Sequence, residues 1–221
     1  MKLFLNALTK FIAGLLLVAL LLFLPAGTIL YPGGLLFLCL LFVPMLLLGI
    51  LMLARARDLL AKRLDVKEKQ GTQRGVVAVM GFIFFSGFIL AGLDFRFGWS
   101  KVPLPVVIVA SVLFLVGYAL YAEVMRENAY LSRTVKVEEG QTVISTGLYA
   151  IVRHPMYTAS TVMFLALPLI LGSWYALISF ALYPVIMIVR ICGEEKLLTA
   201  ELSGYEEYTR KVRFRLIPFI W

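Results

Sequence analysis

Most of this sequence lies in apolar stretches that are long enough to cross a lipid bilayer. A helix needs about 20 consecutive apolar residues to cross a hydrocarbon core of roughly 30 Å. Four stretches meet this requirement: Phe11 to Tyr31, Gly34 to Ala54, Gly75 to Leu93 and Leu104 to Met125. Of the 221 residues 62% are hydrophobic and only 15% charged, more apolar surface than a soluble core could bury. The sequence therefore predicts an all-α polytopic membrane protein.

A fifth apolar region, from Tyr157 to Val189, is too long for one span. Gly172, Ser173 and Trp174 lie near its middle, and glycine and serine are typical of a break between helices. We therefore predict that this region forms two short helices in a tight hairpin. The hairpin brings the predicted total to about six transmembrane helices.

Lysine and arginine are concentrated in the segments that six spans would leave on one side of the membrane. Cytoplasmic segments of membrane proteins carry an excess of these residues. With a cytoplasmic N-terminus, the cytoplasmic segments are 1–10, 55–74, 126–155 and 190–221. They hold all of the 21 basic residues except Arg96 and Lys101. The charge distribution thus predicts an integral membrane protein with both termini cytoplasmic.

The net charge of +8 has a simple origin in this topology. Basic loops orient the spans and attract anionic headgroups, so the expected partners are membrane lipids and not nucleic acid. His154 is the only histidine, and the two cysteines, Cys39 and Cys192, are predicted to lie at different depths. Neither a metal site nor a disulfide is therefore predicted.

The two halves of the chain differ in character. Residues 1–125 are predicted to form four transmembrane helices. The longest loop between them is cytoplasmic, at 55–74, and we assign it no catalytic or binding residue. Residues 126–221 concentrate the polar motifs. Within them, 134–144 alternates polar and apolar residues, which is typical of a β-hairpin. Residues 191–221 are predicted to form a cytoplasmic cap, with an amphipathic helix followed by a strap along the membrane interface.

Two polar clusters flank the predicted helical hairpin. Arg153 and His154 precede it, and Arg190, Glu194 and Glu195 follow it. Because a hairpin returns the chain to the side where it started, the two clusters can meet at the membrane surface. Arg190 and Glu194 share one helical face, while Glu195 lies about 100° further round and can serve a different partner. Polar groups at this depth are costly and tend to be functional.

The polar half also carries short motifs in a fixed order. They are Gly-x-Tyr, Arg-His-Pro-x-Tyr, Arg-Ile-x-x-Glu-Glu-x-x-Leu, Tyr-x-x-Tyr-x-x-x-Val and Arg-x-Ile-Pro. The residues concerned are Gly147, Tyr149, Arg153, His154, Pro155, Tyr157, Arg190, Ile191, Glu194, Glu195, Leu198, Tyr205, Tyr208, Val212, Arg215, Ile217 and Pro218. This pattern resembles the isoprenylcysteine carboxyl methyltransferase family and the related phospholipid methyltransferases. The resemblance covers about residues 126–221, and it departs from the family at Ala159, where glycine is common.

The resemblance implies methyl transfer from S-adenosyl-L-methionine to a lipophilic acceptor. It divides the second half into a cofactor-binding segment, 134–157, a helical hairpin, 157–190, and a C-terminal cap, 191–221, with the cofactor between the last two spans and the cap. The cofactor-binding residues it implies are Tyr149, His154, Pro155, Met156, Tyr157, Glu194 and Glu195. The catalytic residues it implies are Arg190, which faces the acceptor, with Arg153 and Glu194.

The acceptor stays open between a prenylcysteine carboxylate, a phospholipid amine and another lipid. An arginine held by Glu194 could grip a carboxylate or a phosphate. An NADPH-dependent membrane reductase of the sterol-reductase type is a second alternative, because such proteins share a Gly-x-Tyr and an Arg-His-Pro-like segment. Arg190 and the Glu194-Glu195 pair favour methyl transfer. A third alternative, a transporter subunit, is disfavoured because no span carries a charged residue at mid-depth.

Overall fold

The computed structural model describes residues 2–64, 71–128, 130, 131, 137 and 140–221. Throughout these residues the regular structure is helical, and no strand occurs among them, which confirms the all-α prediction. The elements are α1 (Lys2–Ala26), α2 (Pro32–Arg55), α3 (Arg57–Leu64), α4 (Gly71–Phe97), α5 (Leu104–Glu127), the 3-10 helix η1 (Gly147–Ala150), α6 (Pro155–Ile170), α7 (Trp174–Phe180), α8 (Leu182–Glu201) and α9 (Tyr205–Lys211).

The bundle has the length and composition of a polytopic membrane protein. In the described part of the chain, five helices are long and apolar enough to cross a membrane: α1, α2, α4, α5 and the run from α7 through α8. Large apolar side chains such as Leu24, Phe82 and Val109 stand exposed on its outer surface, as expected where lipid covers a protein. The polytopic prediction is confirmed. Because α6 has only 16 residues, the total of six spans stays a prediction.

The predicted break in the fifth apolar region is confirmed. Helix α6 ends at Ile170, and Gly172 adopts a positive φ of 77°, a conformation that glycine reaches without strain. Ser173 then caps α7, because its Oγ accepts a hydrogen bond from Ala176 N at 3.0 Å. After a short interruption at Ala181, α8 continues well beyond the apolar region. The polar residues that follow the hairpin therefore belong to the same helix as its second apolar arm.

Several elements differ from the prediction. Helix α1 ends at Ala26 and not at Tyr31, since Gly27 adopts the left-handed conformation that terminates helices. The predicted loop 55–74 contains α3 and the first residues of α4. The β-hairpin predicted over 134–144 falls partly on residues outside those described, and the described ones, Val137 and 140–144, carry no strand.

Helices α5 and α6 approach closely in the part of the bundle that leads to the site. A Cβ atom added at Gly117 of α5 would lie 2.6 Å from Met163 Cγ and 3.1 Å from the carbonyl oxygen of Ala159 on α6. Ala159 is fully buried at this contact. The small residue that permits the close approach is thus supplied by α5, which explains how alanine fits at position 159.

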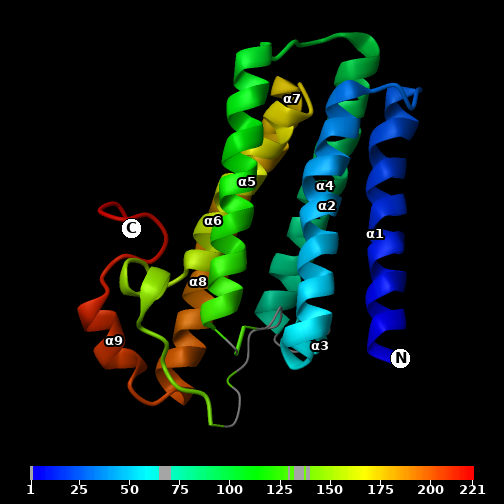
Figure 1. Ribbon diagram of the computed structural model, residues 1–221. Helices are drawn as coiled ribbons and strands as arrows, with labels where there is room; N and C mark the ends of the chain where they lie inside the picture. Colours follow the sequence, from blue (N-terminus) through cyan, green and yellow to red (C-terminus); the bar gives the residue numbers. More distant parts are fainter. Residues whose placement is uncertain (1, 65–70, 129, 132–136, 138–139) are drawn as a thin grey trace.

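The ends of the bundle differ in what they carry (Figure 1). The turns that join α1 to α2, α4 to α5 and α6 to α7 lie at the upper end of the picture, whereas the N-terminus, α3 and α9 lie toward the lower end. The last turns of α8 also lie there, close to η1 and the start of α6. The buried carboxylate of Asp94 lies at the upper end, and the candidate site lies at the lower end.

We expect Asp94 to stabilise the upper end without affecting the site. Its buried carboxylate accepts hydrogen bonds from Ser100 N at 2.7 Å, from Ser100 Oγ at 2.6 Å and from Ser173 Oγ at 2.5 Å. Asp94→Ala should therefore lower the free energy of unfolding by about 2 kcal/mol and Tm by roughly 4–8 °C. Thermal unfolding in detergent measures the change. Lys101→Ala, which removes an exposed side chain nearby, is the control, and equal Tm values for the two variants would contradict the expectation.

Candidate active site

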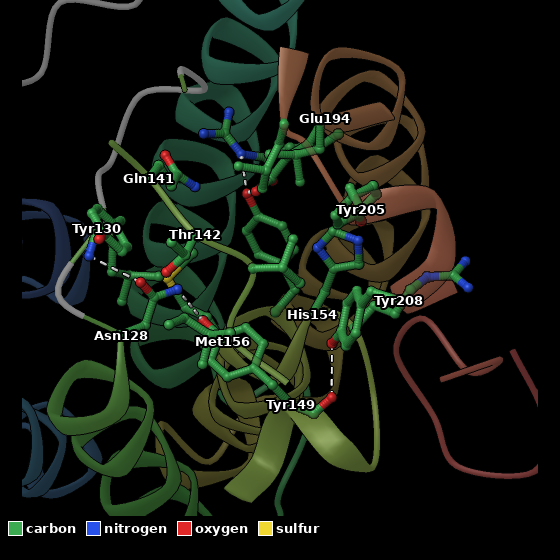
Figure 2. Close-up of a pocket in the computed structure, with 18 residues that line it drawn as sticks. Asn128, Tyr130, Gln141, Thr142, Tyr149, His154, Met156, Glu194, Tyr205 and Tyr208 are labelled. Atoms are coloured by element: carbon green, nitrogen blue, oxygen red, sulfur yellow. Dashed lines mark hydrogen bonds between the residues drawn. The ribbon is translucent and has the colours of Figure 1, made fainter. Parts of the chain in front are cut away.

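A pocket opens at the lower end of the bundle, between α8, α9, the start of α6 and the chain that follows α5. Its volume is about 850 Å³ including the open mouth. It is lined by Asn128, Tyr130, Leu131, Gln141, Thr142, Val143, Ile144, Tyr149, Arg153, His154, Met156, Tyr157, Arg190, Glu194, Leu198, Leu202, Tyr205 and Tyr208. Figure 2 shows one side of it formed by Glu194, Tyr205 and Tyr208 and the opposite side by Asn128, Tyr130 and Gln141.

Glu195 lies beside the pocket and connects three basic side chains. Its Oε1 accepts a hydrogen bond from Arg153 Nε at 2.7 Å and lies 3.2 Å from His154 Nε2, while its Oε2 accepts from Arg215 Nε at 2.7 Å. Glu195, Arg153 and His154 are all buried. A buried carboxylate is stable only when such partners replace its water shell. Glu195 therefore holds together the start of α6, α8 and the C-terminal strap, residues 212–221.

The C-terminal strap is also tied to the start of α6 through the backbone. Arg153 N and His154 N donate hydrogen bonds to the carbonyl oxygens of Phe214 and Arg215, both at 2.9 Å. The guanidinium of Arg153 donates to the carbonyl oxygen of Val212 at 3.0 Å. The Arg-His pair is thus held on one side by the strap and on the other by Glu195, so its orientation toward the pocket is fixed.

A second polar chain lies in the pocket wall itself. Tyr157 OH donates a hydrogen bond to Glu194 Oε2 at 2.6 Å and accepts one from Arg190 Nε at 3.0 Å. The guanidinium of Arg190 also lies 5.9 Å from the centre of the Tyr157 ring, and His154 stacks on this ring at 5.7 Å. One phenol therefore joins a carboxylate and a guanidinium that both line the pocket, so the site offers partners for a cation and for an anion.

Tyrosine side chains form much of the remaining wall. Tyr149 OH accepts a hydrogen bond from Asn128 Nδ2 at 2.9 Å, and Tyr208 OH donates to the carbonyl oxygen of Tyr149 at 2.7 Å. Burial raises the pKa of Tyr149 to about 12 and also raises the pKa of Tyr208 above its usual range. These phenols stay protonated at neutral pH. They present neutral aromatic faces, which attract cations, and hydrogen-bond donors.

Tyr205 carries an unusual hydroxyl group. The side chain is buried, lines the pocket, and its oxygen has no hydrogen-bond partner among the described residues. Burial raises the pKa of this phenol, so it keeps its proton at neutral pH. Leaving a buried hydroxyl without a partner is costly. A polar ligand in the pocket would supply the missing partner.

Gly147 begins η1, the short helix that carries Tyr149, and its backbone conformation allows η1 to lie against Glu127. It adopts a φ of +49°, and a Cβ atom there would collide with the carboxylate of Glu127. This carboxylate accepts hydrogen bonds from Thr146 Oγ1 at 2.8 Å and from Leu148 N at 3.2 Å, which anchors η1 to the end of α5. The glycine of the Gly-x-Tyr motif is thus explained by its positive φ, which strains other residues, and by the Glu127 carboxylate, which a side chain there would displace.

The structure brings most of the predicted site residues together. Those that line the pocket are Tyr149, Arg153, His154, Met156, Tyr157, Arg190 and Glu194. Pro155 is the first residue of α6 and does not line it, and Glu195 acts from behind the pocket through its basic partners. The family resemblance also implied main-chain contacts from residues 141–144, and these residues line the pocket. The sequence interpretation gave no role to Asn128 or Glu127, and only their position directly before the motif region pointed to them.

S-adenosyl-L-methionine fits the chemistry of this donor set. It combines a sulfonium and an ammonium with a carboxylate, and the pocket offers Glu194 and aromatic faces for the cations and hydrogen-bond donors for the carboxylate. The hydroxyl of Tyr205 adds a donor that lacks a partner. No group of three or more histidine, cysteine, aspartate or glutamate residues within the described ranges could hold a metal ion.

Comparison with known proteins identifies the segment that carries this pocket. Among curated proteins, none matches the chain at a significant level. Residues 105–204, a little under half of the chain, match the model of the phospholipid methyltransferase family. The matched segment contains the Arg-His pair, Arg190 and both glutamates, and it confirms the resemblance that the motifs predict. This segment of the chain is therefore similar to the phospholipid methyltransferase family, a family of membrane methyltransferases.

Proposed function

We propose that this protein transfers a methyl group from S-adenosyl-L-methionine to a lipophilic acceptor at the cytoplasmic face of a membrane. The observation that supports this most directly is a pocket in which Glu194, a set of neutral tyrosines and Arg190 surround one space. When bound, the cofactor supplies a methyl group on a sulfonium. Glu194 and the tyrosine faces favour this cation, and Tyr205 OH gains a hydrogen-bond partner.

The proposed roles of the site residues follow from their contacts. Tyr157 holds the Glu194 carboxylate and the Arg190 guanidinium in a fixed relation, since it bonds both. Arg190 then orients the acceptor, and Arg153 and His154 shape the wall because Glu195 already engages them. Methyl transfer is an in-line displacement, so fixing the acceptor at a near-attack distance supplies much of the rate acceleration. The residues 134–157, 157–190 and 191–221 are accordingly proposed as cofactor segment, hairpin and cap.

Two acceptor classes are each favoured by one observation. The buried guanidinium of Arg190 favours an anionic acceptor such as a prenylcysteine carboxylate, which needs no general base. The family match favours a phospholipid amine, which must first lose a proton. Incubation with methyl-labelled cofactor and a native lipid extract distinguishes them. Mild alkali releases labelled methanol from a methyl ester, whereas a methylamine keeps its label.

Cofactor binding distinguishes methyl transfer from the reductase alternative. We expect S-adenosylhomocysteine, at about a hundredfold excess over its Kd, to raise Tm of the detergent-purified protein by roughly 5–10 °C. NADPH should leave Tm unchanged. Thermal unfolding followed by intrinsic tryptophan fluorescence gives both values. Stabilisation by NADPH and not by S-adenosylhomocysteine would overturn the proposed function.

A further inference from the structure

Helix α3 contacts two residues that line the pocket, although it lies outside the segment that matches the family. Motif spacing points to residues 126–221 for the chemistry, and α3 belongs to the other half. Two of its basic residues nevertheless contact residues of the pocket wall. Lys62 and Arg63 are half-buried, whereas Arg57 at the start of the same helix is exposed.

Arg63 contacts Met156, one of the residues that line the pocket. Its Nη1 donates a hydrogen bond to Met156 Sδ at 3.8 Å, and its guanidinium lies 5.3 Å from the centre of the Tyr121 ring. Met156 lines the pocket next to His154 and Tyr149 (Figure 2). A methionine side chain is flexible and adopts several rotamers, so each contact restricts its position. Met156 packs against two apolar clusters, and Arg63 adds a polar contact at its sulfur.

Lys62 contacts a second residue of the pocket lining, Tyr130. Its Nζ lies 5.7 Å from the centre of the Tyr130 ring, and Tyr130 lines the pocket. Tyr130 donates two further hydrogen bonds, from its backbone N–H to Asn128 Oδ1 at 2.9 Å and from its hydroxyl to the carbonyl oxygen of Gly140 at 3.3 Å. The ring under Lys62 therefore connects the end of α5 to the chain that covers the pocket.

Helix α3 is itself held firmly against the bundle. Leu60 is buried, and Leu59 packs against the apolar cluster of Val124, Met125, Leu131 and Tyr149. Lys10 Nζ of α1 donates a hydrogen bond to the carbonyl oxygen of Leu64 at 2.5 Å, the last residue of α3. Because its backbone is anchored by α1 and by this cluster, α3 can hold Met156 and Tyr130 in place.

We propose that Lys62 and Arg63 are positioning residues for the cofactor pocket, which fix two of its lining residues, Tyr130 and Met156. This inference rests on the proposed function, because it assigns the pocket to the methyl donor. Neither residue touches the reacting atoms. The N-terminal half thus contributes to donor binding and does more than anchor the enzyme in the membrane.

The test is the effect of α3 variants on donor binding. Arg63→Met and Lys62→Met keep an apolar stem and remove the cation. Each should raise the Kd for S-adenosylhomocysteine, measured by calorimetry, and the KM for the donor by roughly threefold to tenfold, with kcat changed by less than about twofold. Arg63→Lys should restore the KM to within about threefold of the original. Arg57→Met, on the same helix, is the matched control and should change none of these values.

The possible outcomes separate this inference from the proposed function. If the unsubstituted protein does not bind S-adenosylhomocysteine, the proposed function fails. If it binds and the Lys62 and Arg63 variants bind equally well, the positioning role is wrong. A fall in kcat and Tm without a change in KM, or no rescue by Arg63→Lys, would assign these residues a purely structural role and would also overturn the inference.

Discussion

Replacing Glu195 with alanine is expected to destabilise the protein more than any other single change in the site. The substitution leaves the buried guanidinium of Arg153 without its carboxylate, and Arg215 and His154 lose the same partner. Breaking a buried ion pair by removing one side costs about 3–5 kcal/mol. We expect Tm in detergent to fall by roughly 10 °C. Binding of S-adenosylhomocysteine should fall at least about hundredfold, since the strap and the Arg-His pair lose their common anchor.

Two further variants show that the loss comes from unpaired charge. Glu201→Ala, which removes an exposed carboxylate from the same helix, should leave Tm within about 1 °C. Combining Glu195→Gln with Arg215→Gln removes a carboxylate and one of its cations together. Because residues in one ion-pair network are not additive, this pair should recover part of the Tm lost in Glu195→Gln alone. A Tm for Glu195→Ala within about 2 °C of the original protein would contradict the central role of Glu195.

The helical architecture could be predicted well from the sequence, because bilayer physics acts on long segments. Apolar length marks the spans, and Gly172 with Ser173 marks the turn of the hairpin. Helix α3 was missed, although a signal was present. Asp58 stands in its first turn and Lys62 and Arg63 in its last turn, an arrangement that complements the helix dipole. A short charged segment between two spans is equally typical of a solvated loop, so its composition alone does not predict a helix.

For the candidate site, the sequence predicts which residues lie close together but not how their side chains are oriented. Helical periodicity separates the directions of Glu194 and Glu195, and the structure bears this out. Periodicity does not say which carboxylate faces the pocket, because that depends on how α8 is rotated against α6 and the strap. The partners of Tyr149, namely Asn128 and Tyr208, come from segments far apart in the chain, and no spacing rule links them.

Because Glu194 is proposed to bind the donor and Arg190 to orient the acceptor, we expect their alanine variants to affect donor binding and kcat differently. Glu194→Ala removes the carboxylate from the pocket, and we expect binding of S-adenosylhomocysteine to fall at least about hundredfold. Arg190→Ala leaves Glu194 bonded to Tyr157 OH, so binding should stay within about fivefold while kcat falls at least about hundredfold. Calorimetry and single-turnover methyl transfer measure the two effects separately.

The link through Tyr157 makes this expectation specific. Tyr157→Phe removes the hydroxyl that joins the carboxylate and the guanidinium but keeps the ring under Arg190. Both donor binding and kcat should therefore fall, each by less than in the corresponding alanine variant. Glu207→Ala, an exposed acidic residue on α9, is the control and should change neither. If Arg190→Ala weakened binding as much as Glu194→Ala does, the guanidinium would belong to the donor site, and the acceptor would have to be oriented by another group.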